Sequence, residues 1–191
     1  MMTTIQGFFY ESGAITIFVI SWLSLYFILT LWIFIYKFFS IGVSIQREKK
    51  SLDRIIKNEQ KLPNYPIFDV LATNGNTPRE MLQIWKNQVL KYSTTGLVVL
   101  SIVSSTAPFI GLFGTVIEIL NAFGRLGTGG QVSFDVIAPV ISKALIATAA
   151  GILTAIPAYS FFLLLKRKTY DLSVYIQMQI DVILSKNIEN K

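Results

Sequence analysis

The stretch "IGLFGTVIEIL", residues 110–120, places one carboxylate, Glu118, at the end of a long apolar run. The run belongs to one of three segments with little or no charge, residues 12–36, 92–117 and 136–165. Each is long enough to cross a hydrocarbon layer of roughly 30 Å, which takes about 20 helical residues. The chain has 191 residues, of which 52% are hydrophobic, too many for an ordinary soluble domain. The sequence therefore predicts an all-α membrane protein with three transmembrane helices.

The basic residues are distributed unevenly along the chain. Ten of the 17 lie between Lys37 and Lys91, and five follow the third segment. Because basic flanks stay on the cytoplasmic side, we expect the N-terminus outside and the C-terminus inside. The Gly-rich stretch at 124–135 would then be the short external loop. The net charge of +6 reflects this topology and contact with anionic lipids, and we expect no nucleic-acid partner.

The composition also argues against several kinds of chemistry. The chain has no cysteine and no histidine, which removes disulfides, thiol or imidazole nucleophiles and imidazole metal sites. The "GTGG" at 127–130 lacks the Lys-Ser/Thr pair of a phosphate-binding loop. We therefore expect no enzyme, no cofactor and no metal, and a driving force supplied by a partner protein or an ion gradient.

The charged regions carry helical patterns of their own. Apolar residues at helical spacing over 41–61 predict that the first helix continues until "LPNYP" ends it. The sequence "TPRE" at 77–80 is typical of a capping box and predicts one helix from there to Gly124, bent at Pro108. The third helix is predicted to continue toward the C-terminus through a further apolar stripe, made of Leu172, Tyr175, Ile176, Ile180 and Ile183.

The second and third apolar segments are rich in small and hydroxylated residues, whereas the first is bulky. In the second segment one helical face collects Ser101, Ser104, Pro108, Gly111, Thr115, Glu118 and Ala122. In the third a similar strip contains Ala144, Ala147, Thr148, Gly151, Ala155 and Ala158. Such faces permit close helix packing, while a polar stripe that ends in an acid also favours a wet pore or a partner-binding lumen.

Two motifs carry a resemblance to a known family. "STAPFIGLFGTV" at 105–116 and "APVISKALIATAAGILTAIPA" at 138–158 resemble the paired signature helices of the TolQ and ExbB proton-channel proteins, relatives of the flagellar stator protein MotA. The resemblance implies a homopentamer in the bacterial inner membrane that encloses the transmembrane helices of a TolR- or ExbD-like dimer. A TolA- or TonB-like protein is a further partner that the resemblance suggests. Proton flow would move the partner and transmit work to the cell envelope.

The resemblance also implies an ion pathway. Thr115 and Thr148 fall on the threonines that line the family's lumen, and hydroxyls hydrate a passage without adding charge. The predicted lumen residues are Thr115, Thr148, Pro108, Gly111, Ser104 and Ala144. The motifs do not separate the TolQ from the ExbB type, or proton from sodium. A non-energised scaffold that clamps a partner helix and a standalone ion channel are the alternative functions.

These expectations divide the chain into six parts with the following boundaries. They are the periplasmic N-terminus with the first transmembrane helix (1–39), a cytoplasmic helical segment (40–92), the second transmembrane helix (93–124), a periplasmic loop (125–134), the third transmembrane helix (135–165) and a cytoplasmic C-terminal helix (166–191).

Two residues depart from the family pattern. Glu118 stands where the family has a small residue, and Lys143 stands where it has an acid. At 1.5 Å per residue, Glu118 lies about 4.5 Å outward of Thr115 and Lys143 about 7.5 Å outward of Thr148, so the two charges share nearly one depth. We therefore predict an ion pair between them, within one subunit or across neighbouring subunits, that replaces the family's acid. The alternatives are that Lys143 extends toward the outer headgroups, and that Glu118 itself carries protons at the outer mouth.

If the two charges form a pair, their substitutions are coupled. Lys143→Met leaves the carboxylate alone in a low-dielectric medium, so assembly and activity should fall further than in the double variant Lys143→Met with Glu118→Gln. Yield of assembled complex and ion-dependent activity are the measurements. Equal values for the single and double variants would refute the coupling.

Overall fold

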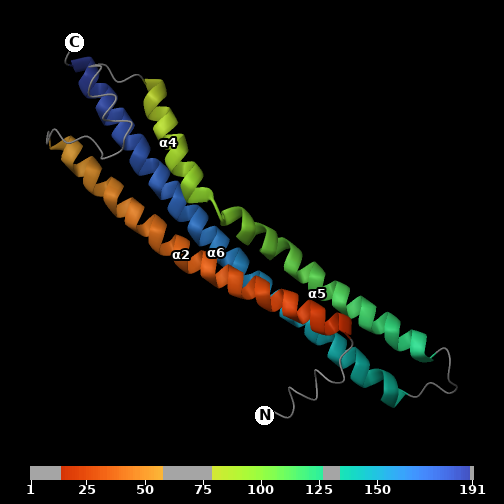
Figure 1. Cartoon of the computed structure of the whole chain (residues 1–191). Coiled ribbons are helices and arrows are strands. Elements are labelled where there is room, and N and C mark those ends of the chain that lie inside the picture. The colour runs from red at the N-terminus through yellow and green to blue at the C-terminus, as the bar shows by residue number, and fades with distance from the viewer. Residues whose placement is uncertain (1–13, 58–78, 127–133, 190–191) are drawn as a thin grey trace. The chain divides into compact units, whose positions relative to one another are not determined.

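The computed structural model describes residues 14–57, 79–126 and 134–189. The elements in these ranges are the helices α2 (Ala14–Ile56), α4 (Arg79–Thr94), α5 (Leu97–Leu126) and α6 (Phe134–Glu189) (Figure 1). Three apolar helical stretches long enough to cross a membrane lie within Ile15–Ile56, Arg79–Gly124 and Ala138–Ser185. The prediction of an all-helical chain with three long apolar helices is confirmed for the described residues.

The chain divides into two compact units, each with its own core. The first unit contains residues 1–33 and 99–162, and the second contains residues 34–98 and 163–191. The long helices α2 and α6 contribute residues to both units.

In the first unit α2, α5 and α6 pack against one another (Figure 1). Their core consists mainly of small side chains. The buried residues of this core are Val19, Leu23, Val103, Ala107, Ala147, Ala155 and Ala158. Large apolar side chains such as Phe109 and Leu153 point outward, each with 69% of its surface exposed. Small residues inside and large ones outside are typical of helices surrounded by hydrocarbon, where close packing drives association.

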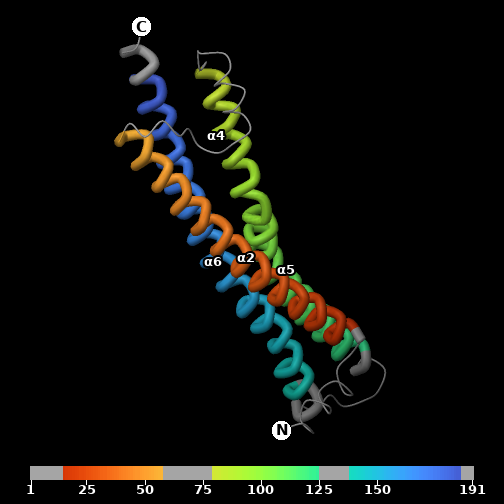
Figure 2. Tube along the Cα trace, turned by 60° about the vertical axis from the view of Figure 1, so that its left-hand side comes forward, coloured from red at the N-terminus to blue at the C-terminus, as the bar shows by residue number. Residues whose placement is uncertain are grey.

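The second unit contains parts of α2, α4 and α6 (Figure 2). In contrast to the first, its core is made of large apolar side chains. Its buried residues are Ile55, Leu82, Trp85, Leu172, Ile176, Ile180 and Ile183. Four residues of the predicted C-terminal stripe are therefore in the core, and this stripe is confirmed. The apolar residues at helical spacing predicted over 41–61 are Ile41, Ile45, Leu52, Ile55 and Ile56. Ile41, Leu52 and Ile55 are buried and Ile45 is partly buried, while Ile56 is 60% exposed and does not belong to the buried face.

One buried polar contact joins α2 to α6 in the second unit. The Gln179 side-chain nitrogen donates to the carboxylate Oε2 of Glu48 at 2.9 Å and to the Glu48 carbonyl at 3.1 Å. Both side chains are almost fully buried. Because a buried carboxylate needs a donor at a defined position, this contact fixes the register of the two helices.

The prediction of one continuous helix from "TPRE" to Gly124 is wrong. The helix α4 ends at Thr94 and α5 begins at Leu97, with Gly96 between them at φ 92°. Left-handed backbone at a helix end favours glycine, so this residue closes α4. Pro108, where a bend was predicted, lies inside α5, and the bend itself stays a prediction. The capping residues at 77–78 and the "LPNYP" break lie outside the described residues.

The left-handed conformation at Gly96 predicts a difference between two glycine substitutions. Gly96→Ala should destabilise the protein by about 1–2 kcal/mol, because a Cβ is strained at positive φ. Gly42→Ala should be neutral or stabilising by up to about 1 kcal/mol, since alanine favours a helix interior. A Cβ at Gly42 would lie 3.8 Å from its nearest neighbour, the Lys168 Nζ.

Thermal unfolding of the purified full chain in detergent checks both variants. A midpoint for Gly96→Ala equal to that of the unaltered protein would contradict the assignment of a strained position.

Candidate functional site

The central feature of the first unit is a contact between the backbones of α5 and α6. A Cβ placed on Gly111 would lie 2.6 Å from the Ala147 carbonyl oxygen and 3.2 Å from the Cα of Gly151. A Cβ on Gly151 would lie 2.6 Å from the Ala107 carbonyl oxygen. Neither position has room for a methyl group, so the two small-residue strips bring the helices to their closest approach here.

Two hydroxyls meet beside this contact. The Oγ1 atoms of Thr115 and Thr148 are 2.5 Å apart, and either one can be the donor. Thr115 also lies 3.1 Å from the Ala144 carbonyl oxygen, and Thr148 lies 3.3 Å from the Gly111 carbonyl oxygen. The side chain of Thr115 is buried, while that of Thr148 is partly exposed. We call these two side chains the threonine pair.

The threonine pair can be ordered in two directions. In one order Thr148 donates to Thr115, which donates to the Ala144 carbonyl. In the other order Thr115 donates to Thr148, which donates to the Gly111 carbonyl. Each hydroxyl has one proton and two lone pairs, so each order satisfies both hydroxyls without any charge. The site can therefore reverse the direction of its hydrogen bonds by rotating two O–H groups.

The remaining predicted lumen residues lie on the same two helices. Ala144 is fully buried and contributes its carbonyl oxygen to the threonine pair. The Ser104 hydroxyl donates to the Ser101 carbonyl of its own helix at 2.8 Å. Pro108 is partly buried, one turn before Gly111. Gly111 and Gly151 take part in close helix packing. A lumen role for Ser104, Pro108, Gly111 and Ala144 stays a prediction.

Glu118 lies one turn beyond Thr115 on α5 and contacts the first helix. Its carboxylate Oε1 accepts a hydrogen bond from the Thr16 hydroxyl of α2. Thr16 is 1% exposed, whereas Glu118 is partly exposed. The Glu118 carboxylate therefore accepts a hydrogen bond from a neutral donor on another helix, which lowers the free-energy cost of a charge in an apolar helix.

Sequence reasoning missed Thr16. The signal was available, because Thr16, Val19, Leu23 and Thr30 recur every three, four and seven residues on one face of α2, and all four are buried. A hydroxyl on such a face of an apolar helix needs a polar partner.

Lys143 is partly buried on α6, next to the buried Ala144. The predicted pair of Glu118 with Lys143 stays a prediction beside the hydrogen bond from Thr16. Among the described residues, no group of three or more histidine, cysteine or acidic side chains is arranged to hold a metal ion.

Comparison with known proteins covers most of the chain. Residues 47–178 match the MotA/TolQ/ExbB proton channel family, and this range includes α5, the threonine pair and Glu118. The chain belongs to the MotA/TolQ/ExbB proton channel family. This match confirms the resemblance seen in the two signature motifs. Together with the three long apolar helices it supports a location in a membrane. The family is described as a proton channel family, not as a family of enzymes.

Individual relatives of the MotA/TolQ/ExbB family differ in how much they share with the chain. The "Putative biopolymer transport protein ExbB-like 1" of Helicobacter pylori is 60% identical over 189 residues, 97% of this chain and the whole of the relative. The ExbB protein of Neisseria gonorrhoeae is 44% identical over 43% of this chain and 37% of its own length. The TolQ protein of Pseudomonas aeruginosa is 52% identical over 31% of this chain and 26% of its own length.

The contact at Gly111 predicts a large effect from one methyl group. Gly111→Ala should destabilise the first unit by about 1–3 kcal/mol, because the new Cβ would overlap backbone atoms of α6 that have little freedom to move. Gly124→Ala is the matched control, since a Cβ there has no neighbour within 4 Å. Denaturation of the purified protein in detergent is the measurement, and equal stability of the two variants would contradict the close approach.

Proposed function

We propose that the chain is the ion-conducting stator subunit of a motor driven by the proton-motive force. In this proposal it forms a homopentamer in the bacterial inner membrane around a TolR- or ExbD-like single-span dimer, and transmits energy to the cell envelope or outer membrane. The name of the relative from Helicobacter pylori favours the ExbB type over the TolQ type. The N-terminus would be periplasmic and the C-terminus cytoplasmic, as the distribution of basic residues indicates.

The observation that carries the proposal is the threonine pair. It combines two neutral hydroxyls in an apolar three-helix unit with two alternative hydrogen-bond orders. Such hydroxyls pass or hydrate an ion without binding it as tightly as a charge would. The threonine pair would line the path beside the partner helices in the assembly.

The acidic group that carries the proton would come from the partner. The only acid within the α5 range is Glu118, and the stretch 138–165 has none. A carboxylate at the level of the threonine pair must therefore belong to another chain. Each proton that crosses the membrane supplies about 2.3 kcal/mol per 100 mV, so a few protons suffice for one conformational step.

A non-energised scaffold is the second candidate, and one observation favours it. The threonine pair is satisfied within one chain, and it sits beside the closest helix contact. Hydroxyls in that position serve helix packing even without ion flow. The two functions differ in whether the hydroxyl of Thr148 is needed for transport or only for assembly.

Thr148→Val separates the two functions, since it keeps the shape of the side chain and removes the hydroxyl. Proton uptake by vesicles that hold the chain with its partner should fall about tenfold or more, because losing one partner of a buried hydrogen bond costs roughly 1–3 kcal/mol. Thr148→Ser retains a hydroxyl and should keep most of the flux.

Assembly of both variants is compared by the mass of the purified complex. Unchanged flux in Thr148→Val with an intact complex would contradict the motor and support the scaffold. Conductance from the purified chain without any partner would instead identify a standalone channel.

A further inference from the structure

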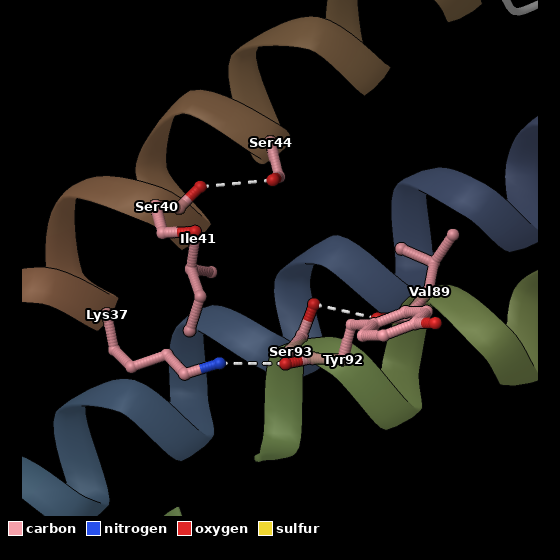
Figure 3. Close-up of a pocket in the computed structure, with 7 residues that line it drawn as sticks. All are labelled: Lys37, Ser40, Ile41, Ser44, Val89, Tyr92 and Ser93. Carbon is pink, nitrogen blue, oxygen red and sulfur yellow. Dashed lines mark hydrogen bonds between the residues drawn. The ribbon is translucent and has the colours of Figure 1, made fainter. Parts of the chain in front are cut away.

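A cavity in the second unit lies between α2 and the last turns of α4, outside the proposed ion path (Figure 3). Its volume is about 190 Å³, several times the roughly 30 Å³ share of one water molecule. The residues that line it are Lys37, Ser40, Ile41, Ser44, Val89, Tyr92 and Ser93. Five of these seven residues carry a polar group on the side chain, namely the lysine, the tyrosine and the three serines.

The charged group of the cavity is Lys37. Its ammonium donates to the Tyr92 carbonyl oxygen at 2.8 Å, which places a positive charge at the C-terminal end of α4 (Figure 3). An ammonium has three donors, and this contact uses one of them. Lys37 is therefore fixed at the cavity while it keeps donors for a ligand.

Hydroxyls accompany this charge. Ser40 and Ser44 follow Lys37 on the same face of α2, one and two turns further along (Figure 3). The Ser44 hydroxyl donates to the Ser40 carbonyl at 3.0 Å, and the Ser93 hydroxyl donates to the Val89 carbonyl at 2.9 Å. These hydroxyls rotate freely enough to donate to a ligand oxygen instead. Ammonium and hydroxyl donors together suit the oxygens of a phosphate group.

The charges of the surrounding segments have the same sign. Residues 37–47 contain two basic residues and no acid, and residues 81–94 also contain two basic residues and no acid. The next acid along α2 is Glu48, which is buried and bound to Gln179. The electrostatic potential at the cavity therefore favours an anion.

The position of the cavity along the chain indicates the source of that anion. Lys37 is the first charged residue of α2, directly after the uncharged stretch at 14–36. Tyr92 lines the cavity and is 75% exposed, and Tyr36 and Phe39, the chain neighbours of the lining residues Lys37 and Ser40, also have exposed rings. Large exposed aromatic side chains beside the first lysine after an apolar helix are typical of the membrane–water interface. The cavity thus lies at the depth of lipid headgroups.

From these observations we infer that the cavity between α2 and α4 binds the phosphate group of an anionic phospholipid. The Lys37 ammonium pairs with the phosphate, and the hydroxyls of Ser40 and Ser44 donate to its remaining oxygens. The acyl chains extend along the apolar surface of α2. This site is independent of ion translocation, since none of its residues belongs to the threonine pair.

The test uses the full chain, purified in a neutral detergent and analysed by native mass spectrometry. The probes are phosphatidylglycerol, phosphatidylcholine and inorganic phosphate. The unaltered protein should retain one phosphatidylglycerol per subunit, and Lys37→Gln should weaken this retention about fivefold, the effect of one basic residue on an anionic lipid. Lys50→Gln removes the same charge from an exposed position of α2 and should have no effect.

Because Lys37→Gln also removes the contact with Tyr92, a second variant is needed. Ser44→Leu fills the cavity, leaves Lys37 in place and should also weaken retention of phosphatidylglycerol. Three results would overturn the inference: equal retention of phosphatidylcholine, equal loss in Lys50→Gln, or displacement of the lipid by inorganic phosphate at millimolar concentration. Lipid retention is measured without a partner or a gradient, so its failure leaves the proposed ion-driven function untouched.

Discussion

The first unit depends on one steric constraint, the contact of the α5 and α6 backbones at Gly111 and Gly151. Neither residue has space for a Cβ, so the two helices lie as close as their main chains allow. This approach brings Thr115 within hydrogen-bond distance of both Thr148 and the Ala144 carbonyl oxygen. The two glycines therefore set the distance between the hydroxyls of Thr115 and Thr148. An ion path that uses these hydroxyls would depend on the same helix contact.

The two units have cores built from side chains of different size. In the first, alanine and glycine form the inner surface and large side chains face outward, as suits hydrocarbon. In the second, Trp85, Leu172 and Ile176 belong to a core of large apolar side chains. Lys37 and its cavity lie on α2 directly after the uncharged stretch. The lipid phosphate proposed to bind there would link α2 to the C-terminal end of α4.

Sequence patterns predicted what depends on periodicity and composition. The long helices, the buried stripe at Leu172, Ile176 and Ile180, and the pairing of small faces follow from spacing along single helices, and the family follows from its two motifs. The break between α4 and α5 was missed because a single glycine, Gly96, is a weak signal for a helix end. The sequence analysis considered only a bend at Pro108 in this region. Spacing on α2 could have indicated that Thr16 is buried, but it could not identify Glu118 as its partner, because the contact joins residues 102 positions apart.

The proposed function requires that water reach the threonine pair in the complex of the chain with its partner. The chain has no cysteine, so Thr148→Cys introduces a unique thiol, and Leu25→Cys introduces one on the exposed face of α2. A membrane-impermeant thiol reagent applied to vesicles that hold the chain and its partner measures access to each site. The account predicts that Thr148→Cys reacts and Leu25→Cys does not. A thiol at position 148 as unreactive as the one at position 25 would contradict it.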